Sequence, residues 1–167
     1  RLGAHYTPRG YVQRLVEETV MEPLRPDWER ALTKAEGAKE SGADAKAVEI
    51  VRGFHHQLCA KRVLDPACGS GSFLIGAYQF LLDWHLSWYV RTGTERWAKS
   101  KNPPIVQRAN GDWVLSLTER KRILLGNIYG VDIDSQAVEV TKLSLLLKVL
   151  EVEGVQASGV NVPGGSS

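Results

Sequence analysis

A glycine turn is the part of this chain best suited to hold a ligand. It occupies residues 69–71 (GSG), after an apolar run that ends in Asp65 and before an amphipathic run over residues 72–89. Glycines accept positive φ and let a ligand approach the backbone closely. The N-terminus of a helix that follows offers free N–H groups to a carboxylate or phosphate. The order predicts a strand, a glycine turn and a helix.

An acidic residue far downstream is the second candidate. Asp132 follows an apolar run over residues 128–131, and Asp134 precedes another helical run from residue 135 to about 153. An acid at the end of a second parallel strand can accept both ribose hydroxyls of an adenosine cofactor. Dinucleotide folds place that acid about 20 residues past the glycines. The much larger separation here predicts an insertion between the two parts of the site.

Helices are expected to precede the first strand. Thr7 and Pro8 are a good N-cap and N1 pair, and Pro23 is expected to end the helix that they begin. Residues 26–62 are expected to be mostly helical, with interruptions at Gly37 and around Ser41. The last strand-like stretch, residues 160–162, is a possible third strand.

Histidines and cysteines give little sign of a metal site. His55 and His56 are adjacent on a predicted helix, where neighbouring residues face apart, so we expect boundary or surface histidines and no metal ligands. Cys59 and Cys68 lack the spacing of metal ligands or of a disulfide framework. This cysteine usage fits a reducing, cytoplasmic location.

Residues 91–117 are expected to be the insertion. They show no period and mix basic with aromatic residues, which could grip DNA phosphates, although a solvated insertion is favoured. The upstream aromatic residues Trp84, Trp88 and Tyr89 are expected to belong to the core.

At 167 residues, 43% hydrophobic and 24% charged, the chain fits one ordinary domain. A net charge of +2 does not by itself demand a nucleic-acid partner, and no apolar run reaches the ~18 residues of a membrane span.

Three strings together resemble a known family. DPACGSGSF at residues 65–73 is similar to the S-adenosylmethionine-binding motif of DNA adenine-N6 methyltransferases, notably the methylase regions of single-chain restriction–modification enzymes (the Eco57I/MmeI-like type). HYTP at residues 5–8 resembles their N-terminal cofactor-contact segment, and NIYGVDID at residues 127–134 resembles their second motif. The resemblance spans essentially residues 3–153.

The resemblance implies an α/β, Rossmann-like methyltransferase fold with an incomplete sheet and an N-terminal helical segment. It implies S-adenosyl-L-methionine as the cofactor, with Asp132 on the ribose, Ile133 on the adenine and Asp134 as a helix N-cap. The cofactor-binding residues expected on this basis are Tyr6, Thr7, Asp65, Ala67, Gly69, Gly71, Asp132 and Ile133. The corresponding domain plan has a helical segment over residues 1–62, a Rossmann-like core over 63–153 and a tail over 154–167.

The implied activity is site-specific adenine-N6 methylation of DNA in restriction–modification or phage defence, with the target base flipped out of the duplex. The implied partners are double-stranded DNA and the rest of a parent polypeptide. Self-association of the chain is a further possible interaction. Methylation of a protein or RNA remains an alternative. A nucleotide-binding oxidoreductase or a non-catalytic binding module is disfavoured, because a Pro66–Cys68 corner replaces the first glycine of a dinucleotide fingerprint.

The family's catalytic motif is Asn/Asp-Pro-Pro-aromatic, at the end of a strand downstream of the second cofactor motif. NPPI at residues 102–105 has isoleucine in the fourth position, lies upstream and follows the polar run 99–101, which does not fit a buried strand. We therefore expect it to be a surface loop without a catalytic role. The chain is predicted to be the cofactor-binding half of an enzyme, with no catalytic residues of its own and no activity alone.

Overall fold

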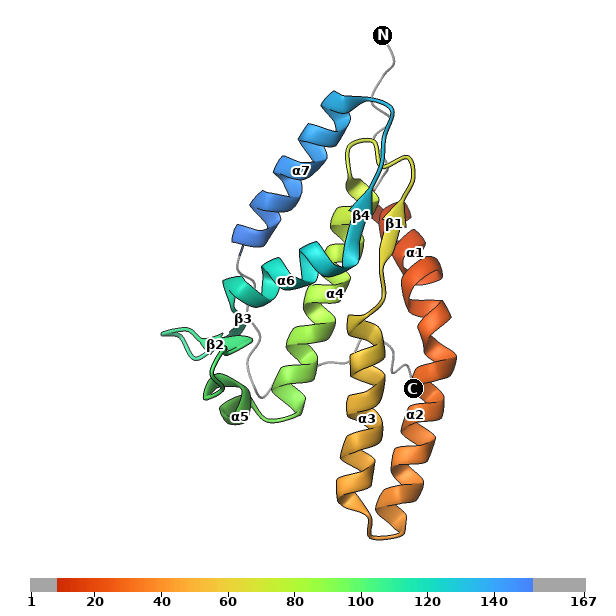
Figure 1. The fold of residues 1–167 in the computed structure, drawn as a ribbon, viewed down its shortest axis with the longest axis vertical. Helices are drawn as coiled ribbons and strands as arrows, with labels where there is room; N and C mark the ends of the chain where they lie inside the picture. Colours follow the sequence, from red (N-terminus) through yellow and green to blue (C-terminus); the bar gives the residue numbers. More distant parts are fainter. Residues whose placement is uncertain (1–8, 152–167) are drawn as a thin grey trace.

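Helix α4 (Ser72–Arg91) is the element around which the others pack in the computed structural model, which describes residues 9–151 (Figure 1). It contacts α1, α5, α6, α7 and strands β1, β3 and β4. A helix that is apolar over most of its surface is stable only when it is covered on several sides. Its fully buried side chains are Leu74, Ala77, Tyr78, Leu81 and His85.

Strands β1 (Val63–Asp65) and β4 (Ile128–Gly130) form a two-stranded parallel sheet, in which Asp65 pairs with Gly130. The pairing continues past the strands, because the Val131 N–H donates to the Asp65 carbonyl at 2.9 Å and the Cys68 N–H donates to the Val131 carbonyl at 2.9 Å. Both strands were predicted from sequence and are confirmed. The possible third strand at 160–162 lies outside the described residues.

The N-terminal helices do not end where the sequence predicted. α1 (Arg9–Val16) passes through a π-helical turn (Glu17–Met21) into α2 (Glu22–Glu40), so the expectation that Pro23 ends the helix is wrong. The backbone stays helical throughout, and Pro23 lies just after the π-helical turn, a type of bulge that interrupts the regular helical hydrogen-bond ladder. Pro26 also lies inside α2. Gly37 also stays helical, and the chain reverses only at Ser41 and Gly42 before α3 (Asp44–Cys59).

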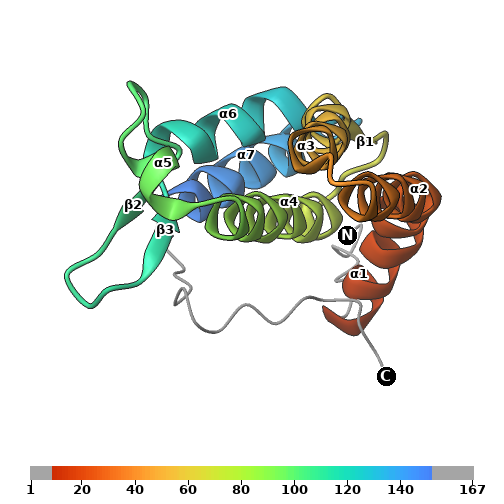
Figure 2. The same ribbon diagram turned by 90° about the horizontal axis from the view of Figure 1, so that it is seen from below.

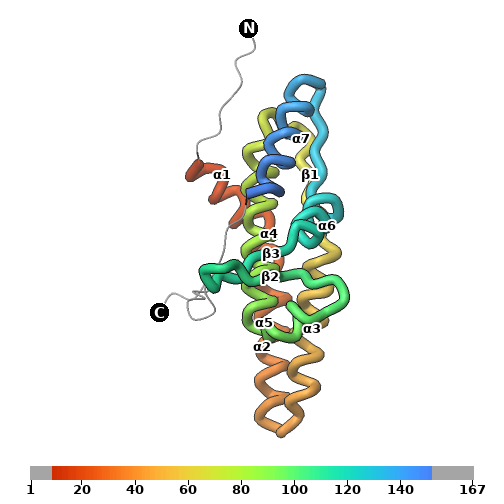
Figure 3. Tube along the Cα trace, turned by 90° about the vertical axis from the view of Figure 1, so that its left-hand side faces the viewer, coloured from red at the N-terminus to blue at the C-terminus, as the bar shows by residue number. Residues whose placement is uncertain are grey.

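Helices α2 and α3 run side by side as a hairpin that extends away from the parallel sheet (Figures 1 and 3). Small side chains, Ala35, Ala38 and Ala47, allow the close approach at the far end. Near the sheet the hairpin packs on α4. There His55 is buried and stacked on Trp88 with ring centroids 4.3 Å apart, whereas His56 is exposed. The expectation of surface or boundary histidines is therefore wrong for His55, because α3 turns that face toward α4.

The insertion is more structured than the sequence suggested. It contains α5 (Thr94–Ala98) and an antiparallel hairpin of β2 (Ile105–Gln107) and β3 (Trp113–Leu115). Ile105 and Leu115 are buried in the core with Trp88 and Tyr89, so the segment is anchored and not a loop throughout. Its basic residues Arg96, Lys99 and Lys101 are exposed, as expected of a solvated insertion. Strands of three residues are too short to show a period in the sequence. The expected core placement of Trp88 and Tyr89 is confirmed.

Two further helices complete the described residues. α6 (Leu117–Asn127) leads directly into β4, and α7 (Ser135–Leu150) follows it. Figure 2 shows α6 and α7 on one side of α4, α1 and α2 on another, and α5 with the β2–β3 hairpin on a third. The described part is thus mostly helical with two small sheets. Over residues 9–151 no helix combines the length and the apolar character that crossing a membrane requires.

Candidate cofactor-binding site

The two sequence motifs meet at the carboxyl ends of β1 and β4. The backbone N–H of Gly69 donates to the Asp132 Oδ2 atom at 2.8 Å. From α7, the Thr141 hydroxyl donates to the Gly69 carbonyl at 2.9 Å. The glycine turn is therefore held from two sides by residues that are distant in the sequence.

Two positions in the turn require glycine. Gly69 and Gly71 have φ values of +50° and +79°, which L-residues with side chains adopt only at a cost. A Cβ atom at Gly71 would also lie 2.6 Å from the Thr141 Cγ2 atom, whereas one at Gly69 would meet nothing within 4 Å. Gly71 is the N-cap residue of α4, so this close packing fixes where that helix begins.

Asp65 shapes the corner that enters the turn. Its Oδ1 atom accepts the Ala67 N–H at 3.0 Å, and the Gly71 N–H donates to the Cys68 carbonyl at 2.8 Å. Short acidic side chains commonly stabilise turns by bonding to a backbone N–H two residues on. The predicted site residues Asp65 and Ala67 thus act together in one turn.

Asp132 accepts hydrogen bonds on both carboxylate oxygens. Besides the Gly69 N–H on Oδ2, its Oδ1 atom accepts the Asp134 N–H at 2.8 Å. The N–H groups of Asp134 and Gly69 lower the pKa of Asp132 below its ordinary value. A carboxylate oxygen can accept more than one hydrogen bond, so the ionised side chain keeps capacity for ligand hydroxyls.

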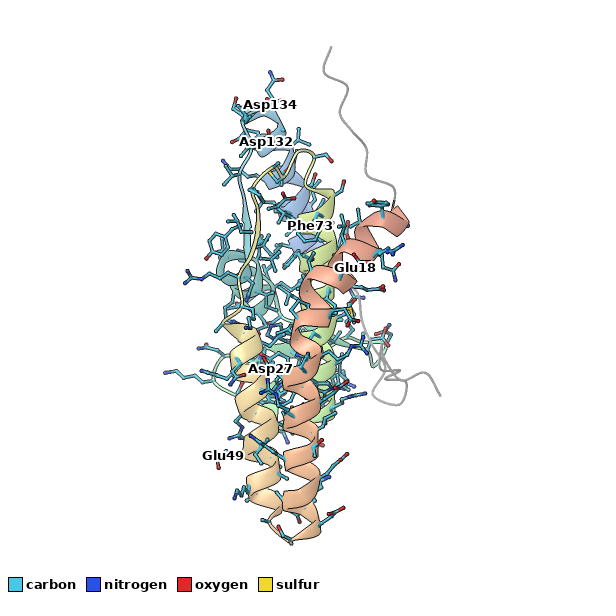
Figure 4. All side chains as sticks on the ribbon, turned by 90° about the vertical axis from the view of Figure 1, so that its right-hand side faces the viewer. Glu18, Asp27, Glu49, Phe73, Asp132 and Asp134 are labelled. Carbon is cyan, nitrogen blue, oxygen red and sulfur yellow. The ribbon has the colours of Figure 1, made fainter. Side chains whose placement is uncertain are left out.

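The residues on either side of Asp132, Val131 and Ile133, are exposed. Ile133 is 106% exposed, which is exceptional for a large apolar side chain. The Asp134 side chain accepts the Gln136 N–H at 2.9 Å and caps α7, as the sequence predicted. Asp132 and Asp134 lie toward the same end of the molecule as Phe73 in the first turn of α4 (Figure 4).

Of the eight predicted residues, Asp65 therefore ends β1 and five lie in the connections after β1 and β4. The other two, Tyr6 and Thr7, are outside the described residues. The helix that follows them, α1, packs tightly on α4, because a Cβ atom at Gly76 would lie 2.6 Å from the Val12 Cγ1 atom. This contact positions α1 against the helix that begins at the glycine turn.

The sequence did not single out Gly130 and Thr141. A Cβ atom at Gly130 would lie 2.6 Å from Leu74 Cδ1, so this glycine lets α4 approach β4. Thr141 is 4% exposed and lies among apolar residues of α7. The only feature of the sequence that could have pointed to Thr141 is a polar residue among the apolar residues of a predicted helix.

The Asn-Pro-Pro segment lies away from this site. Asn102 is exposed in the connection between α5 and β2, and α5 and β2 lie near the end of α4 opposite the glycine turn (Figure 1). A helix of this length spans about 30 Å. Asn102 therefore does not share the edge formed by Gly69 and Asp132. The expectation of a surface loop is wrong for the second half of the segment, because Pro104 is buried and Ile105 begins β2 at 0% exposure.

A family model described as the MmeI DNA-methyltransferase domain matches residues 23–158. Among curated proteins, a putative type II restriction enzyme and methyltransferase of Methanocaldococcus jannaschii, RM.MjaORFECS2P, is 31% identical over 97% of this chain and 13% of that protein. The type II restriction enzyme and methyltransferase RM.Eco57I of Escherichia coli is 33% identical over 64% of this chain and 10% of its own length.

The adenine-specific methyltransferase PglX of Streptomyces coelicolor is 30% identical over 57% of this chain and 6% of its own length. The chain therefore spans only a small part of each of these relatives. No solved structure matches it.

Proposed function

This chain belongs to the MmeI DNA-methyltransferase domain family, and from that premise we propose that it is the cofactor-binding part of an S-adenosylmethionine-dependent DNA adenine-N6 methyltransferase. The relatives named as restriction enzymes and methyltransferases support a role in restriction–modification or phage defence. The relative named as adenine-specific supports adenine as the methylated base.

The observation that carries the proposal is the hydrogen bond from the Gly69 N–H to the Asp132 carboxylate. It joins a glycine turn and an acidic strand end at the carboxyl edge of a parallel pair, the place where ligands bind in open α/β sheets. The order β1–α4–β4 around that edge also supports a Rossmann-like fold.

The residues at this edge fit an adenosine-containing cofactor. In the proposed arrangement the free acceptor capacity of Asp132 takes the ribose hydroxyls, and the exposed Ile133 side chain covers one face of the adenine. The methionine end lies toward the glycine turn and α1, where Tyr6 and Thr7 are proposed to contribute. Asp65 and Ala67 hold the corner in shape.

In the reaction, the bound cofactor supplies an electrophilic methyl group. The residues of this chain bind and orient it, and the pre-ordered glycine turn means that little backbone rearrangement is needed on binding. DNA binding and the chemistry at a flipped base are assigned to other parts of the parent enzyme.

The test uses the full-length protein that contains this chain, duplex DNA and S-adenosylmethionine with a labelled methyl group. Label in N6-methyladenine after hydrolysis of the DNA is the expected result, and Asp132→Ala should reduce its rate of appearance at limiting cofactor. Label in the protein, or in RNA offered in a parallel reaction, with unlabelled DNA would instead support the alternative substrates.

A further inference from the structure

A second cluster of chemically reactive side chains lies on the far part of α4. It consists of His55 and Cys59 from α3 and His85 from α4, each with a ligand atom within 4.8 Å of the others. His85 lies about 20 Å along α4 from the glycine turn. The cluster is therefore separate from the proposed cofactor site.

Burial makes these histidines unusual. His85 is 0% exposed, and neither its Nδ1 nor its Nε2 atom has a hydrogen-bond partner among the described residues. The Nδ1 atom of His55, which is 9% exposed, is also unpartnered there. A buried polar group without a partner costs about 1–3 kcal/mol, so two such rings side by side are expensive unless something binds them.

The spacing suits a metal ion. His55 and Cys59 are four residues apart and so share one face of α3, and the His55 Nε2 atom lies 3.5 Å from the Cys59 Sγ atom. Zn–N bonds of 2.0–2.1 Å and a Zn–S bond of 2.3 Å in tetrahedral geometry place the two ligand atoms about 3.6 Å apart. The rings of His55 and His85 meet at 78° with centroids 5.1 Å apart, which brings the third ligand to the same place.

The surroundings hold the ligands and leave one coordination position. Trp88 stacks on the His55 ring with an interplanar angle of 3°. Both Glu119 oxygens are already bonded, Oε1 to the Tyr89 hydroxyl at 2.7 Å and both atoms to Arg122 at 2.7 and 2.8 Å. Glu119 therefore balances the Arg122 charge and is not a fourth ligand. Cys59 is partly exposed, so a water molecule from solvent can supply the fourth ligand.

We propose that His55, Cys59 and His85 bind one zinc-type divalent cation that ties α3 to α4. Two imidazoles and a thiolate are the ligands that such an ion prefers. On binding, the Cys59 thiol releases its proton to solvent and both imidazoles bind as neutral ligands. The sequence alone suggested no metal ligands, because the third ligand comes from another helix.

The test adds Co²⁺ to the metal-stripped, reduced 167-residue chain and follows absorption. A 1:1 endpoint with thiolate-to-cobalt charge transfer and the strong visible bands of a tetrahedral ion is expected, together with a higher Tm. Cys59→Ser should abolish the charge-transfer band and weaken binding at least about 10-fold. His85→Gln should weaken it comparably.

His56→Ala is the matched control, since it removes the neighbouring exposed imidazole and should leave the titration unchanged. Circular dichroism establishes that each variant is folded. Co²⁺ absorption without the charge-transfer band, equal affinity of Cys59→Ser and the unmodified chain, or no binding would each overturn the proposal.

Discussion

Asp132 has a structural role before any ligand is present. Its carboxylate fixes the glycine turn through Gly69 and the start of α7 through Asp134. A backbone N–H that donates to a charged acceptor forms a stronger hydrogen bond than a neutral pair. The same side chain can therefore both order the site and contact the ligand.

This role predicts a pH dependence. The folded-state pKa of Asp132 is lowered by the backbone N–H groups of Asp134 and Gly69, whereas in the unfolded chain it is about 3.9. Its contribution to stability is therefore fully present above about pH 4 and is lost as the pH falls through the folded-state pKa. The difference in free energy of unfolding between the unmodified chain and Asp132→Asn should be constant from pH 5 to 7 and shrink below pH 4. A difference that is independent of pH in denaturant titrations would contradict this role.

The two glycines of the turn should respond differently to substitution. Gly71→Ala combines left-handed backbone with a clash against Thr141 and should lower the free energy of unfolding by about 2–5 kcal/mol. Gly69→Ala, the matched control, has only the backbone cost of about 1–2 kcal/mol. Denaturant titration followed by circular dichroism measures both. Equal losses would show that the Thr141 contact does not restrict Gly71.

Residues such as Gly69, Gly71 and Asp132 could be predicted because their neighbours in sequence define a strand end or a turn. Thr141 could not, since its partner Gly69 lies 72 residues away. His85 looked like one more member of an apolar stripe until α3 brought His55 against it. Long-range pairs of this kind leave no local pattern.

Among the helices, the close contact between α1 and α4 depends on a glycine, Gly76, which has no side chain to hold them apart. Gly76 faces Val12, with Val16 next to it. Gly76→Ala should destabilise the chain by about 1–2 kcal/mol, because overpacking against Val12 exceeds the gain in helix propensity. In a Val12→Ala background the same substitution should stabilise. Tm and denaturant midpoints of the unmodified chain, the two single variants and the double variant measure this coupling. Additive effects of the two substitutions would show that Gly76 and Val12 are not in contact.

The elements themselves were predictable to different degrees. α4 and the two parallel strands follow from strong apolar runs with a glycine turn between them. The continuation of α1 into α2 could not be predicted, because Pro23 normally signals a helix end and the π-helical turn before it leaves no mark in the sequence. The β2–β3 hairpin was missed because each strand is only three residues long, and its burial depends on packing against α4.

For the whole molecule, exposed apolar surface on α7 is the outstanding feature. Leu143, Leu146, Leu147 and Leu150 are each more than half exposed. Patches of this kind commonly mark contact surfaces. Since the chain spans only 13% of its M. jannaschii relative, we expect further parts of a parent protein to cover them.

The isolated chain should therefore self-associate. In sedimentation experiments the average mass should rise with concentration, and the Leu146→Glu/Leu150→Glu double variant should shift it toward the monomer. Val48→Glu, which adds a charge at an exposed valine of the α2–α3 hairpin, is the control and should have no effect. A concentration-independent monomer for the unmodified chain would contradict the expectation.

The most direct test of the proposed cofactor site is a calorimetric titration of the chain with S-adenosylhomocysteine, its 2′,3′-dideoxy analogue and NAD. We predict that S-adenosylhomocysteine binds more tightly than NAD and that Asp132→Ala weakens it about 10- to 100-fold, since a hydrogen bond to a charged group contributes roughly 1.5–3 kcal/mol. The variant should bind the dideoxy analogue and S-adenosylhomocysteine almost equally. NAD binding as tight as S-adenosylhomocysteine, or an Asp132→Ala variant with unchanged affinity, would contradict the proposed cofactor site.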